Sequence, residues 1–116
     1  MKPASAIPIE IETFIRDVAD SFVKIELLKF FHRNHSLLGT IEDIAVAIGR
    51  DTRTVKKALN ALISAGVLTC EGERTGPLWR YAPREDLGKR VDVFLQFYGT
   101  AKGRRATVYR VLEGDV

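Results

Sequence analysis

Cysteine and histidine are scarce in this sequence, and their scarcity limits the kinds of site that the chain can form. Its 116 residues include one cysteine, Cys70, and two histidines, His32 and His35. A single cysteine excludes any disulfide within the chain. A metal site would need these three residues to meet in space, and no cysteine cluster or second histidine pair accompanies them. We therefore expect no metal or other cofactor, and Cys70 is more simply a small apolar strand residue.

Long apolar runs are also missing. No stretch has enough consecutive apolar residues to cross a bilayer, and residues 1–11 lack the apolar core of a secretory leader. We therefore expect no membrane partner and a cytoplasmic location. Hydrophobic residues make up 46% of the chain and charged residues 28%, which is typical of globular proteins. A chain of this length buries one core, so we predict a single domain over 1–116.

The sequence lacks a recognisable catalytic or nucleotide-binding motif. No carboxylate constellation accompanies the two histidines. Gly72 and Gly76 lack the spacing and the following lysine of a phosphate-binding loop, and turn geometry explains them better. We therefore expect that the chain is not an enzyme.

Positive charge is concentrated in the middle of the chain. Residues 1–49 contain five Lys/Arg and seven Asp/Glu, whereas residues 50–90 contain nine Lys/Arg and five Asp/Glu. The remaining residues contain four Lys/Arg and three Asp/Glu, within a net charge of +3 for the whole chain. This asymmetry indicates that one face of the protein meets a polyanion.

Helical periodicity dominates the first half of the sequence. Apolar residues recur at helical spacing after Pro8, which suits a first helical turn and predicts a helix within 8–20. Over 22–31, apolar residues occupy nearly the whole circumference of a second helix, which must therefore be central. Thr40 and the aspartate three positions later have the spacing of a capping box, and Gly49 suits a left-handed helix end, so a short third helix is predicted between them.

A fourth helix, over 52–65, carries the clearest functional signal. Asp51 is a good N-cap, and Gly66 is a good C-terminal stop. One face of this helix is apolar at the i, i+3, i+4, i+7 spacing: Val55, Ala58, Leu59, Leu62 and Ile63. The opposite face is polar and basic without one acidic residue: Arg53, Lys56, Lys57, Asn60 and Ser64. A solvated surface would explain such a face in isolation, but a short capped helix and a turn before it favour a helix-turn-helix.

A β-hairpin is predicted next along the chain. Residues 67–71 and 78–82 have strand propensity, and a glycine-rich turn separates them. Trp79 and Tyr81 alternate with Arg80 on the second strand, and we expect these aromatic side chains to cover the core rather than to stack on bases.

These elements resemble a known family. The matching segments are Ile41-Glu42-Asp43-Ile44-Ala45 with Ile48-Gly49, Asp51 to Val55, Leu59-x-x-Leu62, and Ala65-Gly66-Val67-Leu68. Residues 40–82 resemble the winged helix-turn-helix core of bacterial and archaeal regulators of the MarR and ArsR type, and the resemblance extends back over the apolar helix from Phe22. It implies a mainly α fold with a small β-hairpin wing (α+β) over 21–82, with added N-terminal and C-terminal helices. It also implies a transcriptional regulator that binds double-stranded DNA.

The resemblance places the helix over 52–65 in the major groove. The side chains that it implies in DNA contact are Thr52, Arg53 and Thr54 at the helix entry, Lys56, Lys57 and Asn60 further along it, Arg74 at the hairpin tip, and Arg80 on the returning strand. Arg53 suits a guanine and Asn60 an adenine, whereas the two lysines suit phosphates. Glu71 and Glu73 flank the hairpin and would repel phosphates, so we expect the hairpin to contribute less than the helix.

The C-terminal part of the sequence has two interpretations. An apolar stripe at helical spacing predicts a helix over 84–98, which matches the extra helix that many such regulators use for dimerisation. Alternating residues between 91 and 112 would instead form a hairpin, and strand propensity favours it. We choose the helix, because the resemblance favours it. Residues 99–116 are then expected to form a basic tail or a terminal strand.

A homodimer is the expected active form. One recognition helix contacts only a few base pairs, whereas a two-fold pair reads half-sites about one helical turn apart. The candidate contact residues are Phe14, Ile15, Phe94 and Tyr98. The sequence does not reveal an effector pocket.

Two other functions remain open at this stage. A winged-helix module of a larger transcription or other macromolecular assembly would use the same helices for protein contacts, and the small net charge and the acidic hairpin are compatible with it. An accessory domain of an enzyme is the third alternative.

Overall fold

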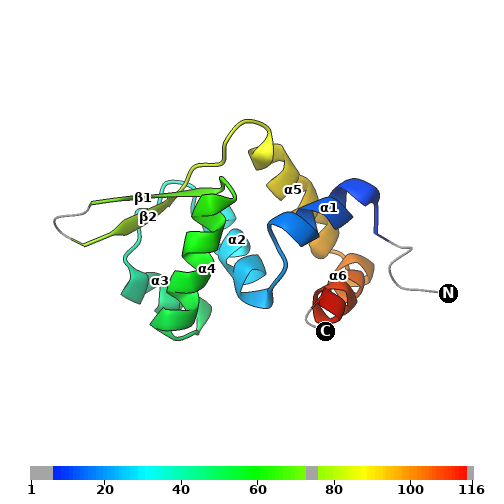
Figure 1. Cartoon of the computed structure of the whole chain (residues 1–116), viewed down its shortest axis with the longest axis horizontal. Helices are drawn as coiled ribbons and strands as arrows, with labels where there is room; N and C mark the ends of the chain where they lie inside the picture. The colour runs from blue at the N-terminus through cyan, green and yellow to red at the C-terminus, as the bar shows by residue number, and fades with distance from the viewer. Residues whose placement is uncertain (1–6, 73–75, 115–116) are drawn as a thin grey trace.

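The computed structural model describes residues 7–72 and 76–114, and this part of the chain contains six helices and one two-stranded sheet (Figure 1). The elements in chain order are α1 (Ile9–Asp17), α2 (Phe22–Arg33), α3 (Ile41–Ile48), α4 (Thr52–Ser64), β1 (Leu68–Glu71), β2 (Leu78–Tyr81), α5 (Leu87–Tyr98) and α6 (Ala101–Gly114). The fold is therefore mainly helical with a small antiparallel sheet, as the sequence predicts.

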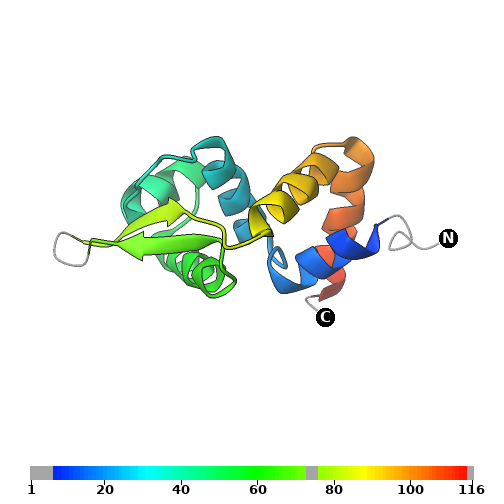
Figure 2. The same cartoon turned by 90° about the horizontal axis from the view of Figure 1, so that it is seen from above.

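The elements form two lobes along an elongated molecule of 53 × 29 × 21 Å (Figure 2). In the hairpin lobe, α2, α3 and α4 pack together, α4 contacts β1, and α2 contacts β2. In the terminal lobe, α5 packs against both α1 and α6. The first and last described helices, α1 and α6, belong to the terminal lobe, so the β1–β2 strands lie at the opposite end of the molecule from them (Figure 1).

Local hydrogen bonds set the helix boundaries in the hairpin lobe. The Ser21 hydroxyl accepts a hydrogen bond from the Lys24 N–H at 3.2 Å and begins α2. The Thr40 hydroxyl accepts one from the Asp43 N–H at 3.1 Å and begins α3. Gly49 ends α3 with φ of 71°, a left-handed conformation that glycine adopts without strain. The predicted cap at Thr40 and the predicted helix end at Gly49 are confirmed.

The hairpin is fixed to the helices by its second strand. The two strands pair antiparallel with Leu68 opposite Tyr81. Gly39, just before α3, exchanges backbone hydrogen bonds with Trp79 at 3.1 and 2.9 Å, which ties the start of α3 to β2. Trp79 is 2% exposed and Tyr81 is 9% exposed, so both aromatic side chains cover the core, as expected.

In the terminal lobe, the C-terminal residues differ from one expectation drawn from the sequence. Residues 87–98 form the predicted helix α5, and the alternative hairpin is not adopted. The expectation of a basic tail or terminal strand over 99–116 is wrong, because residues 101–114 form α6. Gly103, Ala106, Thr107 and Val111 are its buried residues, and they recur at helical spacing. Gly103 allows α6 to approach α5 closely, since a Cβ atom there would lie 1.9 Å from the Phe97 carbonyl oxygen.

The same lobe buries three of the four residues expected at a dimer interface. The Phe14 and Phe94 rings pack against each other within the chain, tilted by 34°, with ring centroids 5.2 Å apart and at most 1% exposure, and Ile15 is fully buried. Tyr98 is half-buried and stacks on Phe94 at 5.8 Å. The apolar stripes of α1 and α5 therefore contact each other in one protomer, and the assignment of Phe14, Ile15 and Phe94 to a dimer surface is wrong.

Among the residues that the structure describes, no helix combines the length and the apolar composition that a bilayer-spanning segment requires.

Candidate nucleic-acid interface

The first turn of α4 is fixed by its cap. Asp51 accepts a hydrogen bond from the Thr54 N–H at 2.8 Å and another from the Thr54 hydroxyl at 2.9 Å. These bonds lower the pKa of Asp51, because they stabilise the charged carboxylate. The Thr54 hydroxyl proton is thus used within the helix, which makes Thr54 a residue that orients the helix start rather than a donor to a ligand.

The apolar face of α4 determines which face looks outward. Val55, Leu59 and Leu62 are fully buried, and Ala58 is 7% exposed, because this face packs against α2 and α3. The opposite face is therefore presented to solvent on the side of the molecule nearest the viewer in Figure 1.

That outward face is basic, and the described part of the chain leaves it uncovered. Its exposed residues are Thr52, Arg53, Thr54, Lys56, Lys57, Asn60 and Ser64. No acidic residue occurs in α4, and Arg53, Lys56 and Lys57 form no ion pair within 4.0 Å among the described residues. At 1.5 Å per residue, the distance along the helix from Arg53 to Asn60 is roughly 10 Å, which is comparable to the width of the major groove.

Arg50 extends this basic surface, although it is not among the contact residues predicted from the sequence. It is exposed, lies between the end of α3 and the Asp51 cap, and has no carboxylate partner within 4.0 Å among the described residues. The sequence feature that indicates its role is a positive charge directly before an N-cap, at the start of a helix whose outward face is basic.

On the described part of the hairpin, Arg80 is paired with an acidic side chain. Arg80 is half-exposed, and its Nε lies 2.9 Å from an oxygen of Glu71 on the neighbouring strand. The register places Leu78 opposite Glu71, so Arg80 reaches Glu71 diagonally across the sheet. The charge of Arg80 is thereby largely compensated. Arg74 lies outside the described residues.

The residues considered for a metal site do not come together. His32 Nε2 lies 2.8 Å from Asp92 Oδ1, and the rings of His32 and His35 are 5.4 Å apart. Cys70 is exposed on β1. Within residues 7–72 and 76–114, no three His, Cys, Asp or Glu side chains are grouped to hold a metal ion.

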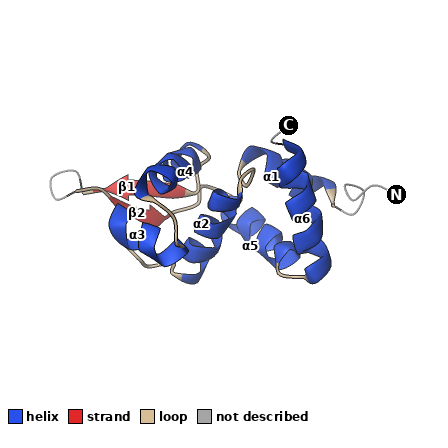
Figure 3. Ribbon diagram, turned by 90° about the horizontal axis from the view of Figure 1, so that it is seen from below, coloured by secondary structure: helices blue, strands red, loops and turns tan. Residues whose placement is uncertain are grey.

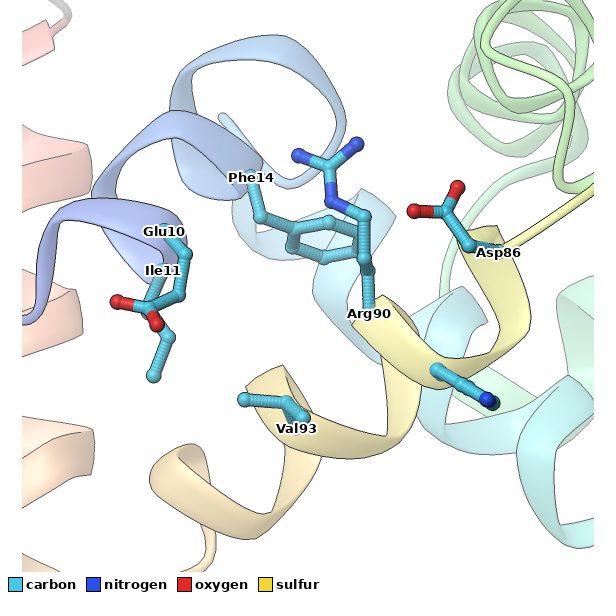
Figure 4. Close-up of a pocket in the computed structure, with 7 residues that line it drawn as sticks. Glu10, Ile11, Phe14, Asp86, Arg90 and Val93 are labelled. Carbon is cyan, nitrogen blue, oxygen red and sulfur yellow. The ribbon is translucent and has the colours of Figure 1, made fainter.

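A separate groove of about 190 Å³ lies between α1 and α5 (Figure 4). Its apolar side chains are Ile11, Phe14 and Val93. The Arg90 guanidinium lies over the Phe14 ring, 5.6 Å from the ring centroid. The other lining residues are Glu10, Asp86 and Lys89, so two acidic and two basic side chains border the apolar centre.

Comparisons with protein-family models, with curated proteins and with solved structures find no significant match to this chain.

Proposed function

We propose that the chain is a small winged-helix transcriptional regulator that binds double-stranded DNA. In this proposal α4 lies in the major groove, the β1–β2 hairpin is the wing, and the protein acts in the cytoplasm. One observation carries the proposal: the outward face of α4 has three cations without carboxylate partners among the described residues, one amide and no acid, while its inward face is fully packed.

The packing of the hairpin lobe supports this proposal. A recognition helix must be held rigidly by its apolar face so that its polar face can enter a groove without rearrangement. Val55, Leu59 and Leu62 provide this attachment to α2 and α3. Arg53 and Asn60 then suit contacts to base edges, while Lys56 and Lys57 suit phosphates on either side of the groove.

A homodimer is part of the proposal, because a single α4 helix contacts only a few base pairs. The exposed apolar side chains of the terminal lobe are Ile9, Val93, Tyr109 and Leu112. Val93 lines the groove of Figure 4, whose two acidic and two basic lining residues would pair with their counterparts across a two-fold axis. Val93→Asp should therefore shift the sedimentation coefficient towards the monomer, whereas Val46→Asp, at an exposed apolar site in the hairpin lobe, should leave it unchanged.

The competing function is a winged-helix module for protein contacts. The Glu71–Arg80 ion pair favours it, because it removes free positive charge from the hairpin. The acidic first turn of α3, with Glu42 and Asp43, favours it as well. The basic face of α4 is the stronger evidence, since a basic surface without acidic residues is typical of a protein that binds a nucleic-acid phosphate backbone.

Salt-dependent duplex binding tests the proposal. Replacing Lys56 and Lys57 by alanine should weaken binding to every duplex and lower the slope of log K against log salt by about 1.8. A matched variant with Lys102 and Arg105 replaced by alanine should retain the wild-type slope, because these exposed cations lie on α6 in the terminal lobe. Equal slopes for the wild type and the Lys56/Lys57 variant would contradict the proposal. If the slopes differ as expected, selection from a random duplex pool would identify the preferred sequence.

A further inference from the structure

A second basic surface lies on the other side of the molecule from α4. It is a hollow of about 760 Å³ where the C-terminal half of α2 meets the end of α5 and the start of α6. Figures 2 and 3 show α4 and α5 on opposite sides of the long axis. The residues that matter here are Lys29, His32, Arg33, Leu95, Tyr98 and Arg104.

Three cations converge on this hollow from two helices. Lys29 and Arg33 lie one turn apart on α2, and Arg104 lies in the first turns of α6. None of the three is within 4.0 Å of a carboxylate oxygen among the described residues. Asp92 is the acidic residue that lines the hollow, and it is already held by His32 at 2.8 Å. The hollow therefore has a surplus of positive charge.

One wall of the hollow is apolar and aromatic. Leu95 and Tyr98 are half-buried there, and the Tyr98 ring is stacked on Phe94 beneath it. The Lys29 ammonium lies 5.8 Å from the centroid of the Tyr98 ring. Such a wall suits a flat or apolar part of a ligand, whereas the cations suit its charged part.

The start of α6 adds to the positive potential. This helix has 14 residues and begins at Ala101, and Gly99, two residues earlier, lines the hollow. Helix N-termini carry partial positive charge and favour anions. The partial charge at the start of α6 therefore adds to the positive charges of Lys29, Arg33 and Arg104.

We propose that this hollow binds a small phosphorylated ligand with an aromatic or apolar part. The phosphate groups lie between Lys29, Arg33 and Arg104, and the ring lies against Leu95 and Tyr98. A small ligand fits better than a second nucleic acid, because the hollow is concave and its volume is within the usual range of small-molecule sites, about 300–1,000 Å³. This site is separate from α4, so the proposal can be tested independently of the proposed DNA binding.

Calorimetric titration of the full chain with ATP, in the absence of divalent cations, tests this proposal. We expect saturable binding of one ATP per chain, and weaker binding of inorganic pyrophosphate, which has the charge but not the ring. The double variant Arg33→Ser with Arg104→Ser should lower ATP affinity at least about 10-fold, since it removes two charge-assisted contacts. The double variant Lys56→Ser with Lys57→Ser makes the same change in net charge and should leave ATP affinity unchanged.

Duplex binding by the same two variants separates this site from α4. The Arg33/Arg104 variant should bind duplex DNA like the wild type, and saturating duplex should not displace ATP. Three results would each overturn the proposal: no saturable ATP binding up to about 5 mM, an equal loss of ATP affinity in both double variants, or displacement of ATP by duplex together with weaker duplex binding of the Arg33/Arg104 variant. The first would show that the hollow has no phosphate site, the second that only net charge matters, and the third that the hollow contacts nucleic acid.

Discussion

Asp51 binds Thr54 through both of its carboxylate oxygens, one to the backbone N–H and one to the hydroxyl. This relationship couples the start of α4 to the protonation state of one exposed acid. The pKa of Asp51 is lowered in the folded chain by its hydrogen bonds to Thr54, first to the backbone N–H and then to the hydroxyl. A carboxyl whose folded pKa is depressed contributes stability above its unfolded pKa and loses that contribution as the pH falls through the folded pKa.

Replacing Asp51 by asparagine should therefore reduce the acid sensitivity of the fold. Asparagine caps helices about as well as aspartate but does not titrate. We expect thermal unfolding of the wild type to shift downwards more steeply than that of Asp51→Asn as the pH falls below about 4. Asp51→Ala should unfold at a lower temperature than both at neutral pH, because the cap is lost. Identical pH profiles for the wild type and Asp51→Asn would show that this cap does not contribute to the acid transition.

The caps could be predicted from the sequence because they depend on residues within one turn. Thr40 with Asp43 marks the start of α3. Asp51 marks the start of α4, and Gly66 lies just after its end. The outward face of α4 could be predicted for the same reason, since burial and exposure alternate within one helix.

Contacts between distant segments were not predictable in this way. An apolar stripe shows that a helix is covered, but it does not show whether the cover is another helix of the same chain or a second copy. Phe14 and Phe94 are 80 positions apart in the sequence, and only the structure shows that their rings are in contact. The pairing of Arg80 with Glu71 depends in the same way on the strand register, which the sequence alone does not give.

Gly103 illustrates the same limit and gives a test of the terminal lobe. Residues 99–116 were expected to form a basic tail or a terminal strand, yet the missing side chain of Gly103 is what allows α6 to pack against α5. Gly103→Ala should lower the free energy of unfolding by about 3 kcal/mol, because the new Cβ would collide with the Phe97 backbone. Chemical denaturation would measure this loss.

Gly114→Ala is the matched control for that substitution. A Cβ at this position would meet only the Arg110 side chain at 3.4 Å, and position 114 is exposed. Alanine also favours helices over glycine, so this variant should be at least as stable as the wild type. Equal stabilities of the two variants would contradict the close contact of α5 with α6.

Glu71→Gln should strengthen duplex binding if the hairpin lies near phosphates. The substitution removes an acid and releases Arg80 from its ion pair, so the slope of log K against log salt should rise by up to about 0.9. Stability should change little, because exposed ion pairs contribute about 0–1 kcal/mol. Glu113→Gln, an exposed site on α6, gives the same change in net charge and should leave the slope unaltered. A rise in both variants would assign the effect to net charge alone.

Asn60 and Lys57 should separate base recognition from phosphate contact. Both are exposed on the outward face of α4, but an amide can form two hydrogen bonds with an adenine edge, whereas a lysine acts as a point charge. Asn60→Ala should weaken binding to the preferred duplex by about 1–3 kcal/mol and relax the preference at one base pair, with little effect on an unrelated duplex. Lys57→Ala should weaken binding to both duplexes to a similar degree. Fluorescence anisotropy with the two duplexes at one salt concentration measures the difference, and an equal loss on both duplexes for Asn60→Ala would place that side chain at the backbone instead of at a base.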